Sequence, residues 1–310
     1  MNEKKIATRD AYGEALVALG KDNADLVVLD ADLSQSTKTA KFAAAYPERF
    51  FNIGIAEADL FGTAAGLAAA GKLPFASTFA VFATGRAYDQ IRNSIAYPRL
   101  NVKIAATHAG LTVGEDGASH QALEDIALMR ALPGMTVIVP ADGREAYRAV
   151  FAAAEFDGPV YLRLGRPKVP QITADIPFII GKGVVLREGD DLSIFSTGTM
   201  SSEALKAAQI LAEQSLQTEV IHLPTIKPLD QELIVQSAAK TGVAITVEEH
   251  NIIGGLGSAV AEVLVEKCPI KMQRLGVRDT FGESGSPAAL LEKHGLTAAH
   301  IAEAAKALKQ

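Results

Sequence analysis

Glu57 is the residue whose surroundings most clearly suggest chemistry. It lies in FNIGIAEADLFGTAAGLAAAG, residues 51–71, where apolar and small residues predict that its side chain is buried. A carboxyl group kept from water has its charged form disfavoured, so it can share a proton with a bound partner. An acid in the first turn of a helix can also be there simply because the helix dipole favours it. Glu57 is therefore either a proton-sharing group or an ordinary helix residue.

A second set of polar residues suits a phosphorylated small molecule. It combines two arginines, a serine, two histidines and an aspartate: Arg9, Ser36, His108, Asp116, His120 and Arg166. Imidazole titrates near neutrality and can move protons, whereas guanidinium groups and hydroxyl donors bind a phosphate monoester. Taken singly, each histidine could be a satisfied loop residue and each arginine a solvated or paired one.

These residues follow the predicted strands of an α/β fold. Short β-branched runs alternate with alanine-rich amphipathic stretches, a pattern typical of a parallel sheet flanked by helices. We predict strands at 25–30, 49–53, 74–78, 102–107, 136–140 and 160–164. Helices fit at about 9–20, 37–46, 57–70, 80–96, 121–131 and 142–155, with Thr8 and Asp142 as caps of the first and last. Ligands bind at the carboxyl ends of parallel strands, so we expect the candidate residues at one edge of the sheet.

The pattern predicts two domains. The first comprises residues 1–170, and the proline-containing stretch RPKVPQITADIPFIIGKG introduces a linker at 171–190. A smaller α/β domain of residues 191–310 follows, with strands at DLSIFST, TEVIHL and GVAITVEE. Its helices are expected from about 199, near 230, from about 256 and after Thr297, which is predicted to cap the closing helix.

Composition excludes several classes of protein. The 310 residues are 48% hydrophobic with a net charge of −6, and no basic run suggests nucleic-acid binding. The single cysteine, Cys268, rules out a disulfide framework, and no cysteine–histidine cluster has zinc-site spacing. The start MNEKKIATRD lacks the apolar core of a signal peptide, and no apolar run is long enough for a membrane. We therefore expect a cytoplasmic protein.

In combination, the motifs resemble the C-terminal half of transketolase, a thiamine diphosphate enzyme. The resemblance covers essentially the whole chain and is carried, in the family's order, by IAEADLFGTAAGLAAAG, STFAVFATGRAYDQIR, THAGLTVGEDGASHQALEDIALMRALPGMTVIVPADG and LRLGRP. It implies a pyrimidine-binding domain followed by the family's C-terminal domain. The implied reaction is reversible transfer of a two-carbon ketol unit from a ketose phosphate to an aldose phosphate.

The resemblance assigns cofactor roles to five residues. Glu57 matches the glutamate that bonds N1′ of the aminopyrimidine, and that proton sharing activates the cofactor. Phe79 and Phe82 match aromatic residues that line the aminopyrimidine pocket, although in isolation they look like core packing. Asp32 and Leu33 match residues beside the thiazolium ring. The family's third aromatic position is occupied here by Gly85, and the nearby Tyr88 is out of register.

The substrate residues follow in the same way. His108, Asp116 and His120 match residues that contact the sugar hydroxyls and phosphate. His108 or His120 would assist proton transfers, because imidazole titrates near neutrality, and Asp116 would anchor the C2 hydroxyl of an aldose acceptor. The family's phosphate cluster corresponds to Arg9, Ser36 and Arg166.

A separate partner chain is implied by what the sequence lacks. The family binds the cofactor's pyrophosphate through a divalent cation, held by a GDG sequence and a later asparagine, and this chain has no such element. The ligands of Mg²⁺ or Ca²⁺ are therefore expected from an N-terminal-half subunit in an α₂β₂ heterotetramer. A face of small residues could meet that subunit or pack within its own domain: Gly62, Ala65, Gly66 and Ala69.

Several alternatives stay open at this stage. The β subunit of a 2-oxoacid dehydrogenase has the same two domains, and only the His108–His120 stretch argues against it. A deoxyxylulose-phosphate synthase-like subunit, a branched-sugar transketolase and a non-catalytic subunit are further possibilities. In the second domain, Glu248, Glu249 and His250 could form an interface or a second site, or a solvated loop.

Overall fold

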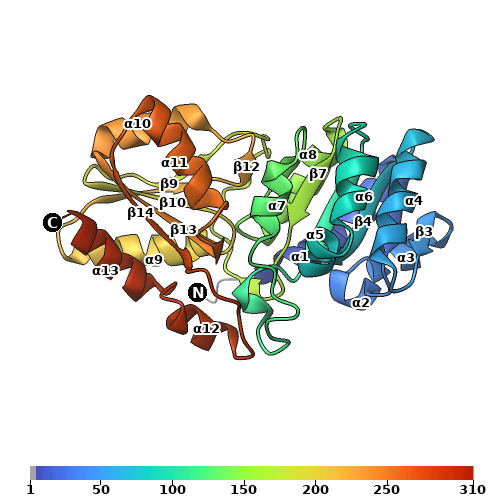
Figure 1. The fold of residues 1–310 in the computed structure, drawn as a ribbon, viewed down its shortest axis with the longest axis horizontal. Helices are drawn as coiled ribbons and strands as arrows, with labels where there is room; N and C mark the ends of the chain where they lie inside the picture. The colour runs from blue at the N-terminus through green and yellow to red at the C-terminus, as the bar shows by residue number, and fades with distance from the viewer. Residues whose placement is uncertain (1–4, 310) are drawn as a thin grey trace.

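Two α/β units lie side by side, as Figure 1 shows. The computed structural model describes residues 5–309, so residues 1–4 and 310 of the predicted domains lie outside the described range. Each unit contains a mostly parallel sheet flanked by helices, which confirms the predicted fold class. The exact domain boundaries stay a prediction.

The first sheet brings the predicted strands together in a single parallel array. Its order is β12-β6-β7-β5-β4-β2-β3, and every pair except β12–β6 is parallel. The strands are β2 (Leu26–Asp30), β3 (Phe50–Asn52), β4 (Leu73–Phe79), β5 (Lys103–Thr107), β6 (Thr136–Ile138), β7 (Val160–Arg163) and β12 (Thr225–Lys227). Apolar runs such as LVVLD in β2 are buried along their whole length, as expected for a sheet covered on both faces.

Helices cover both faces of this sheet. One face packs against α1 (Thr8–Asp22), α3 (Ala40–Ala45) and α8 (Gly143–Glu155). The other packs against α4 (Glu57–Ala69), α5 (Ala80–Gly85), α7 (Asp125–Ala131) and a π-helical turn at Ile91–Ala96. Shorter elements are β1 (Ile6–Ala7), α2 (Ser34–Thr37), α6 (Tyr88–Gln90), β8 (Lys168–Val169) and 3-10 turns at Pro47–Arg49 and Leu111–Val113.

Two predicted helices are broken where local chemistry opposes a continuous helix. The helix predicted at 80–96 is divided into α5, α6 and the π-helical turn. Near the break, the hydroxyl of Thr84 donates to the carbonyl of Ala80, a contact that bends helices, and Gly85 follows. The helix predicted at 37–46 is divided at Lys38, which has a left-handed φ of 75°.

The predicted caps had different outcomes. Asp142 does cap α8, because its carboxylate accepts from the backbone N–H of Glu145 at 2.9 Å. The prediction for Thr8 is wrong: it is the first residue of α1, and its hydroxyl instead accepts from the N–H of Gly165 at 2.7 Å. Thr297 directly precedes the closing helix as predicted, with its hydroxyl 2.8 Å from Nδ1 of His300.

The second unit has two strands, β9 and β14, that the sequence pattern did not predict. Its sheet has the order β14-β13-β10-β11-β9, with only β9 antiparallel. The strands are β9 (Val184–Arg187), β10 (Leu192–Ser196), β11 (Thr218–His222), β13 (Val243–Asn251) and β14 (Lys271–Val277). The helices are α9 (Met200–Glu213), α10 (Gln231–Thr241), α11 (Leu256–Lys267), α12 (Pro287–Lys293) and α13 (Ala298–Lys309).

The two units are joined by more than one passage of the chain. Strand β12, from the C-terminal half, pairs with β6 of the first sheet and lies between the two lobes in Figure 1. In the predicted linker, the backbone N–H and the hydroxyl of Thr173 donate hydrogen bonds to Asp142, and residues 184–187 form β9.

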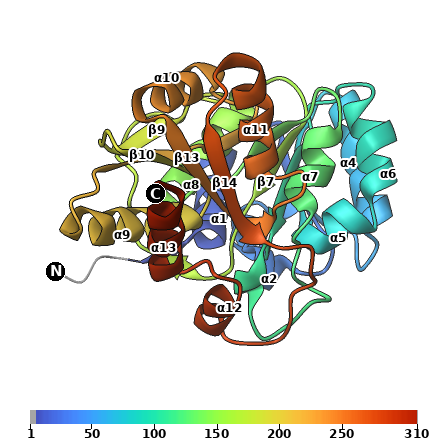
Figure 2. The same ribbon diagram turned by 60° about the vertical axis from the view of Figure 1, so that its left-hand side comes forward.

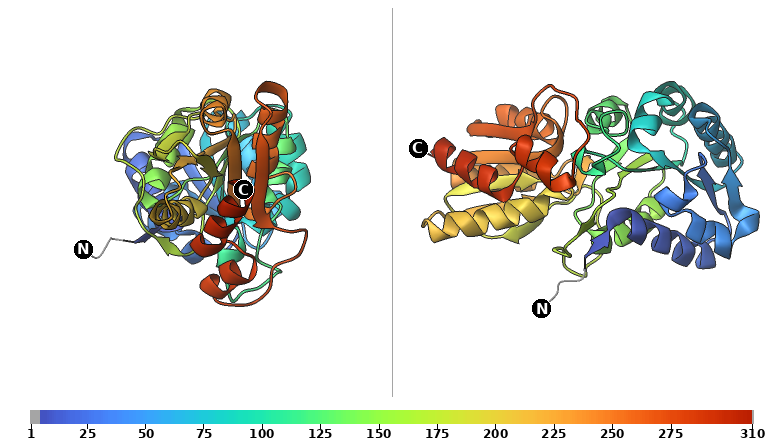
Figure 3. Two further views of the ribbon diagram at one scale, coloured as in Figure 1. Left: turned by 90° about the vertical axis from the view of Figure 1, so that its left-hand side faces the viewer. Right: turned by 90° about the horizontal axis from the view of Figure 1, so that it is seen from below.

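Figure 2 shows α12 at the opposite end of the second unit from α10, and in Figure 3 α13 lies at the outer end of that unit. Of the helices in residues 5–309, none combines the length and apolarity that a membrane crossing needs.

A buried ion pair lies where the units meet. Arg163, at the end of β7, donates to both carboxylate oxygens of Asp125 at 2.7 and 3.1 Å, and Tyr161 donates to the same carboxylate at 2.7 Å. Burial alone would raise the pKa of Asp125, but the charge and hydrogen bonds of Arg163 bring it below its usual value.

We expect Asp125→Asn to lower the free energy of unfolding by about 3–5 kcal/mol, because Arg163 would keep a buried charge without its counter-ion. As a control, Asp175→Asn removes the exposed partner of Arg148 and should change stability by less than about 1 kcal/mol. Urea unfolding at pH 7 measures both, and equal small losses in the two variants would contradict the structural role of Asp125.

Candidate active site

The predicted clustering at one sheet edge is what the structure shows. Strands β2, β4, β5 and β7 run parallel, so the segments that follow them lie at the same end of the sheet. The segments are residues 31–36 after β2, helix α5 and Arg86 after β4, residues 108–121 after β5, and Arg166 after β7.

Glu57 is buried as expected, but it has a partner that the sequence did not suggest. It is the first residue of α4 and only 5% exposed. Its Oε1 accepts from a guanidinium nitrogen of Arg86 at 3.0 Å. The arginine side chain is 57% exposed, and its guanidinium carbon lies 4.1 Å from the centre of the Phe82 ring. A planar cation thus spans the buried carboxylate and an aromatic face.

The aromatic residues and the two histidines form one cluster. The rings of Phe79 and Phe82 are stacked at 5.7 Å between centroids. Phe79 also stacks on the His108 ring at 3.8 Å. His120 lies edge-on to both phenylalanines, at 6.1 and 5.5 Å. The Phe79 side chain is buried, whereas those of Phe82 and His120 are only partly covered, so the cluster has an accessible side.

His108 is held in a single neutral form. A guanidinium nitrogen of Arg9 lies 2.9 Å from Nε2, so Nε2 accepts, and Nδ1 donates to the Thr107 hydroxyl at 2.8 Å. Burial, reinforced by the positive charges of Arg9 and Arg166, lowers the pKa of His108 to about 3. The low pKa of His108 contradicts the expectation that this ring titrates near neutrality.

Arg9 and Arg166 flank this neutral ring. Arg9 also donates to the carbonyl oxygen of Ser36 at 3.0 Å, and its Nε is a buried donor that has no hydrogen-bond partner among residues 5–309. Arg166 donates to the carbonyl of Val113 and lies 3.8 Å from the Asp116 carboxylate. The structure thus brings Arg9, Ser36 and His108 into direct contact and links Arg166 to Asp116.

Asp32 and Leu33 belong to a loop that a buried aspartate shapes. Asp30, at the end of β2, accepts from the N–H of Leu33 at 2.6 Å and from two threonine hydroxyls, Thr37 and Thr39. Asp32 has a left-handed φ of 64° and exchanges hydrogen bonds with the side chain of Asn52. The described contacts connect these two residues with the aromatic cluster only through the chain to Ser36.

Two details of the predicted cofactor wall are now defined. A Cβ added at Gly85 would meet no atom within 4 Å, so the missing third aromatic leaves open space. Tyr88 does not replace it, because its hydroxyl donates to the carbonyl of Leu128 in α7.

The small-residue face of α4 is open. A Cβ added at Gly62 or Gly66 would meet no atom within 4 Å, and Ala69 is exposed. This excludes packing of the two glycines against their own domain. The prediction was wrong for Ala65, which does not belong to this open face because it is buried in the core of the first unit.

Residues 5–309 contain no candidate metal site. No cluster of three or more histidine, cysteine, aspartate or glutamate side chains is arranged to hold a metal ion. The described residues therefore do not fit a divalent cation, and we assign no step to a metal held by this chain.

Sequence reasoning missed Arg86 and underrated Glu249. Arg86 lies within STFAVFATGRAYDQIR, and its position seven residues after Phe79 carried no signal of a contact with Glu57. Glu248, Glu249 and His250 are buried in β13, so the solvated-loop alternative is wrong for them.

Two families match the chain. The transketolase pyrimidine-binding domain matches residues 4–171, and the transketolase C-terminal domain matches residues 181–301.

Individual proteins are similar over nearly the whole length. A protein of Methanocaldococcus jannaschii assigned as a C-terminal section of transketolase is 52% identical, over 95% of this chain and 94% of its own. A 6-deoxy-6-sulfo-D-fructose transketolase subunit of Clostridium sp. (strain MSTE9) is 45% identical, over 96% of this chain and 92% of its own. A solved split-gene transketolase, described as an inactive beta4 tetramer, is 58% identical with a TM-score of 0.92, covering 98% of this chain and 100% of its own.

The neutral state of His108 has a measurable consequence for stability. Because its folded pKa lies below the ordinary value of 6.5, the stability it contributes is present above about pH 6.5 and is lost as pH falls toward 3. Between pH 7 and pH 5, the chain should lose about 2 kcal/mol more than the His108→Gln variant, which has no group to protonate there. Urea unfolding at the two pH values checks this, and parallel losses in both proteins would contradict it.

Proposed function

The chain belongs to the transketolase family and corresponds to its C-terminal section, and from this premise we propose that it is one subunit of a two-chain transketolase. The proposed reaction moves a two-carbon ketol unit from a ketose phosphate to an aldose phosphate with thiamine diphosphate as cofactor. The observation that supports it most is the placement of a buried glutamate beside an accessible phenylalanine, next to a basic and histidine-containing cluster.

The residues around Glu57 fit an aminopyrimidine ring. Glu57 would hold the ring through N1′ and share a proton there, because a buried carboxyl group at hydrogen-bond distance from a ring nitrogen can act as a general acid and base. Phe79 and Phe82 offer flat apolar faces, and the open space at Gly85 leaves room beside them. Asp32 and Leu33, held by Asp30, would border the thiazolium. When bound, thiamine diphosphate supplies the carbanion chemistry at the sugar carbonyl.

The basic side of the cluster fits the sugar phosphate. Arg9 and Arg166 present positive charge, and the buried Nε of Arg9 is a donor still in need of an acceptor. Ser36 adds a hydroxyl, while Asp116 faces Arg166 and would bind a sugar hydroxyl. His108, fixed in a neutral state, would orient a hydroxyl, and His120 would move protons.

The partner subunit is proposed on two observations. The described residues provide no cation site for a pyrophosphate, so Mg²⁺ or Ca²⁺ would be held by an N-terminal-half chain. The open glycine face of α4, beside Glu57, allows the close helix approach that such a chain needs. The similar split-gene protein is described as inactive when it forms a beta4 tetramer, and we expect this chain alone to be inactive too. With the partner, we expect an α₂β₂ heterotetramer.

A second substrate class deserves a place in the assay. The Clostridium relative acts, by its name, on a 6-sulfo sugar, and a terminal sulfonate is an anion that the same arginines could bind. An assay of the reconstituted pair with 6-deoxy-6-sulfo-D-fructose beside the sugar phosphates would show which terminal anion is preferred.

The reconstituted pair should transfer ketol units between xylulose 5-phosphate and ribose 5-phosphate and should not decarboxylate pyruvate. Glu57→Gln should lower kcat by at least about a hundredfold, because the amide cannot accept and return a proton at N1′. Size-exclusion chromatography serves as the control, since the variant pair should assemble like the wild type. Near-normal turnover in Glu57→Gln would remove this residue from the mechanism, and turnover of pyruvate instead of the sugars would replace the proposed reaction.

Arg86 now engages the two groups that the aminopyrimidine needs, the Glu57 carboxylate and the Phe82 face. It should therefore compete with the cofactor, and Arg86→Ala in the reconstituted pair should bind thiamine diphosphate about fivefold more tightly. Because the Arg86 side chain is half-exposed and screened by water, we take its ion pair with Glu57 and its cation–π contact with Phe82 to contribute roughly 0.5–1 kcal/mol each. Isothermal titration calorimetry measures the affinity, with Arg86→Lys as a variant that keeps the charge but not the planar group. Weaker binding in Arg86→Ala would mean that Arg86 helps to hold the cofactor.

A further inference from the structure

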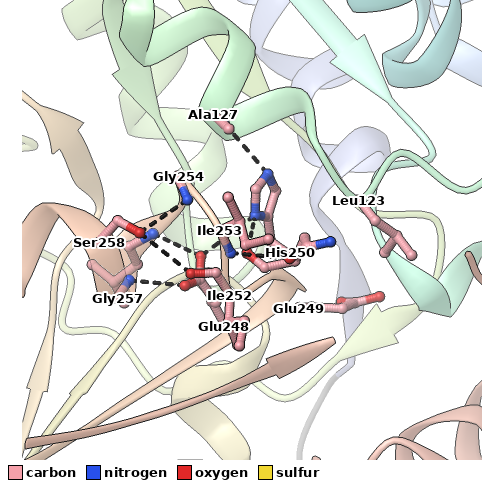
Figure 4. Close-up of polar contacts among 12 residues, drawn as sticks. Leu123, Ala127, Glu248, Glu249, His250, Ile252, Ile253, Gly254, Gly257 and Ser258 are labelled. Carbon is pink, nitrogen blue, oxygen red and sulfur yellow. Dashed lines mark hydrogen bonds and ion pairs between the residues drawn. The ribbon is translucent and has the colours of Figure 1, made fainter. Parts of the chain in front are cut away.

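Two adjacent glutamates of β13 serve different parts of the molecule. Successive side chains of a strand point to opposite faces, and in Figure 4 Glu248 lies on the side of Gly257 while Glu249 lies on the side of Leu123. Glu248 accepts from the backbone N–H groups of Leu256 and Gly257 at 2.6 and 2.8 Å. It therefore caps α11 within the second unit, and no external anion is needed at that turn.

Glu249 reaches from the second unit into the first. Its side chain is only 4% exposed, and its Oε1 accepts from the backbone N–H of Thr112 in the 108–121 loop. Its Oε2 accepts from the hydroxyl of Thr199, which precedes α9, at 3.1 Å. Its own carbonyl accepts from Arg163 at 3.0 Å. One residue thus connects the loop with both sheets.

The loop is fitted closely to this carboxylate. Gly110 has a φ of 82°, a conformation that favours glycine, and a Cβ at that position would lie 2.4 Å from Oε1 of Glu249. Any larger residue there would have to displace the carboxylate. The backbone of the loop at Gly110 is therefore packed directly against the Glu249 carboxylate.

Other groups of the second unit hold the same segment. The N–H of Asn251 donates to the carbonyl of Leu123 at 2.8 Å. The hydroxyl of Ser284 donates to the carbonyl of Glu115 at 2.6 Å, and the amide of Gln121 donates to the carbonyl of Glu283 at 2.9 Å. The loop that presents Asp116 and His120 is therefore anchored at several points by the C-terminal unit.

We propose that Glu249 is a positioning residue through which the C-terminal unit fixes the 108–121 loop for sugar binding. The proposal rests on the proposed function, since it assigns the loop to the sugar substrate. Glu249 does not touch the cofactor residues Glu57, Phe79 or Phe82 in the described contacts, so its effect should fall on the substrate and spare the cofactor. Loss of its carboxylate would leave the buried N–H of Thr112 without an acceptor and free the loop to shift.

The kinetic test uses the reconstituted pair saturated with thiamine diphosphate. Glu249→Ala should raise KM for the sugar phosphate about tenfold, which corresponds to about 1.4 kcal/mol. Its calorimetric affinity for thiamine diphosphate should stay within about twofold of the wild type. Glu249→Gln keeps an oxygen acceptor for Thr112 and should restore a KM close to that of the wild type. An unchanged KM in Glu249→Ala, or a matching loss of cofactor affinity, would overturn the proposal.

Glu248→Ala is the matched control. It removes an equally buried carboxylate from the neighbouring position, but one whose hydrogen bonds among the described residues go to the start of α11 and whose Oε2 lies 3.8 Å from Nδ1 of His250. We expect it to lower the thermal unfolding temperature and to leave KM for the sugar near the wild-type value. An equal rise of KM in both variants would show that general loosening of the second unit, and not Glu249, controls the loop.

Hydrogen–deuterium exchange separates this proposal from the proposed function, because it needs no turnover. In the chain itself, Glu249→Ala should speed amide exchange at residues 110–116, whereas Glu248→Ala should speed it at 256–260. Thr199→Val, which removes only the hydroxyl that orients Glu249, should have a smaller effect in the same loop and serves if Glu249→Ala folds poorly. Unchanged exchange at 110–116 in both Glu249→Ala and Thr199→Val would refute the anchoring role. A wild-type pair that turned over no sugar would refute the proposed function alone.

Discussion

The arrangement of the two units depends on the hydrogen bonds of one buried guanidinium group, that of Arg163. From the end of β7 it donates to Asp125 on α7, to the carbonyl of Ala122 and to the carbonyl of Glu249 on β13. A buried charge costs several kcal/mol unless it is paired and hydrogen-bonded, and Asp125 supplies the pairing. Asp125 and Ala122 belong to the same unit as Arg163, so sliding the second unit against the first would break the bond to Glu249. The edge of the first sheet thus keeps its shape because the second unit is fixed to it.

In the candidate site, a charged arginine lies next to an uncharged histidine. Arg9 touches His108, yet the imidazole carries no charge of its own, because burial and the neighbouring cations hold its pKa at about 3. An anionic end group would meet the arginines, and a hydroxyl group would meet a ring whose donor and acceptor nitrogens are fixed. This arrangement can orient a molecule with a phosphate at one end and hydroxyl groups along its length.

Much of this architecture could be predicted from the sequence, and the exceptions have physical causes. Apolar runs placed the parallel strands of the first sheet, and the rule that ligands lie at strand carboxyl ends placed His108, Phe79 and Arg166 at one edge. Strands β9 and β14 escaped notice, since the short VVLR follows directly on the proline-containing stretch that introduces the predicted linker and KMQRLGV has no simple alternation. Arg86 also escaped, because its partner Glu57 lies 29 positions away. For Glu249 the sequence left an interface role open, and it could not name Thr112, which lies 137 positions away, as the partner. The neutrality of His108 depends first on burial and then on the charge of Arg9, and no local pattern connects the two residues.

The two sides of the site are completed to different degrees within this chain. On the proposed substrate side, residues of the chain hold one another in place: Thr107 and Arg9 fix His108, and Glu249 accepts a hydrogen bond from the loop that follows it. On the proposed cofactor side, the partner of the buried Glu57 carboxylate among the described residues is a half-exposed arginine, beside a partly covered phenylalanine and an open glycine face. A carboxylate paired with an exposed cation is held weakly, so an incoming group can take its place at small cost. The surface that lacks internal partners is therefore the surface best suited to be completed by a cofactor and a second polypeptide.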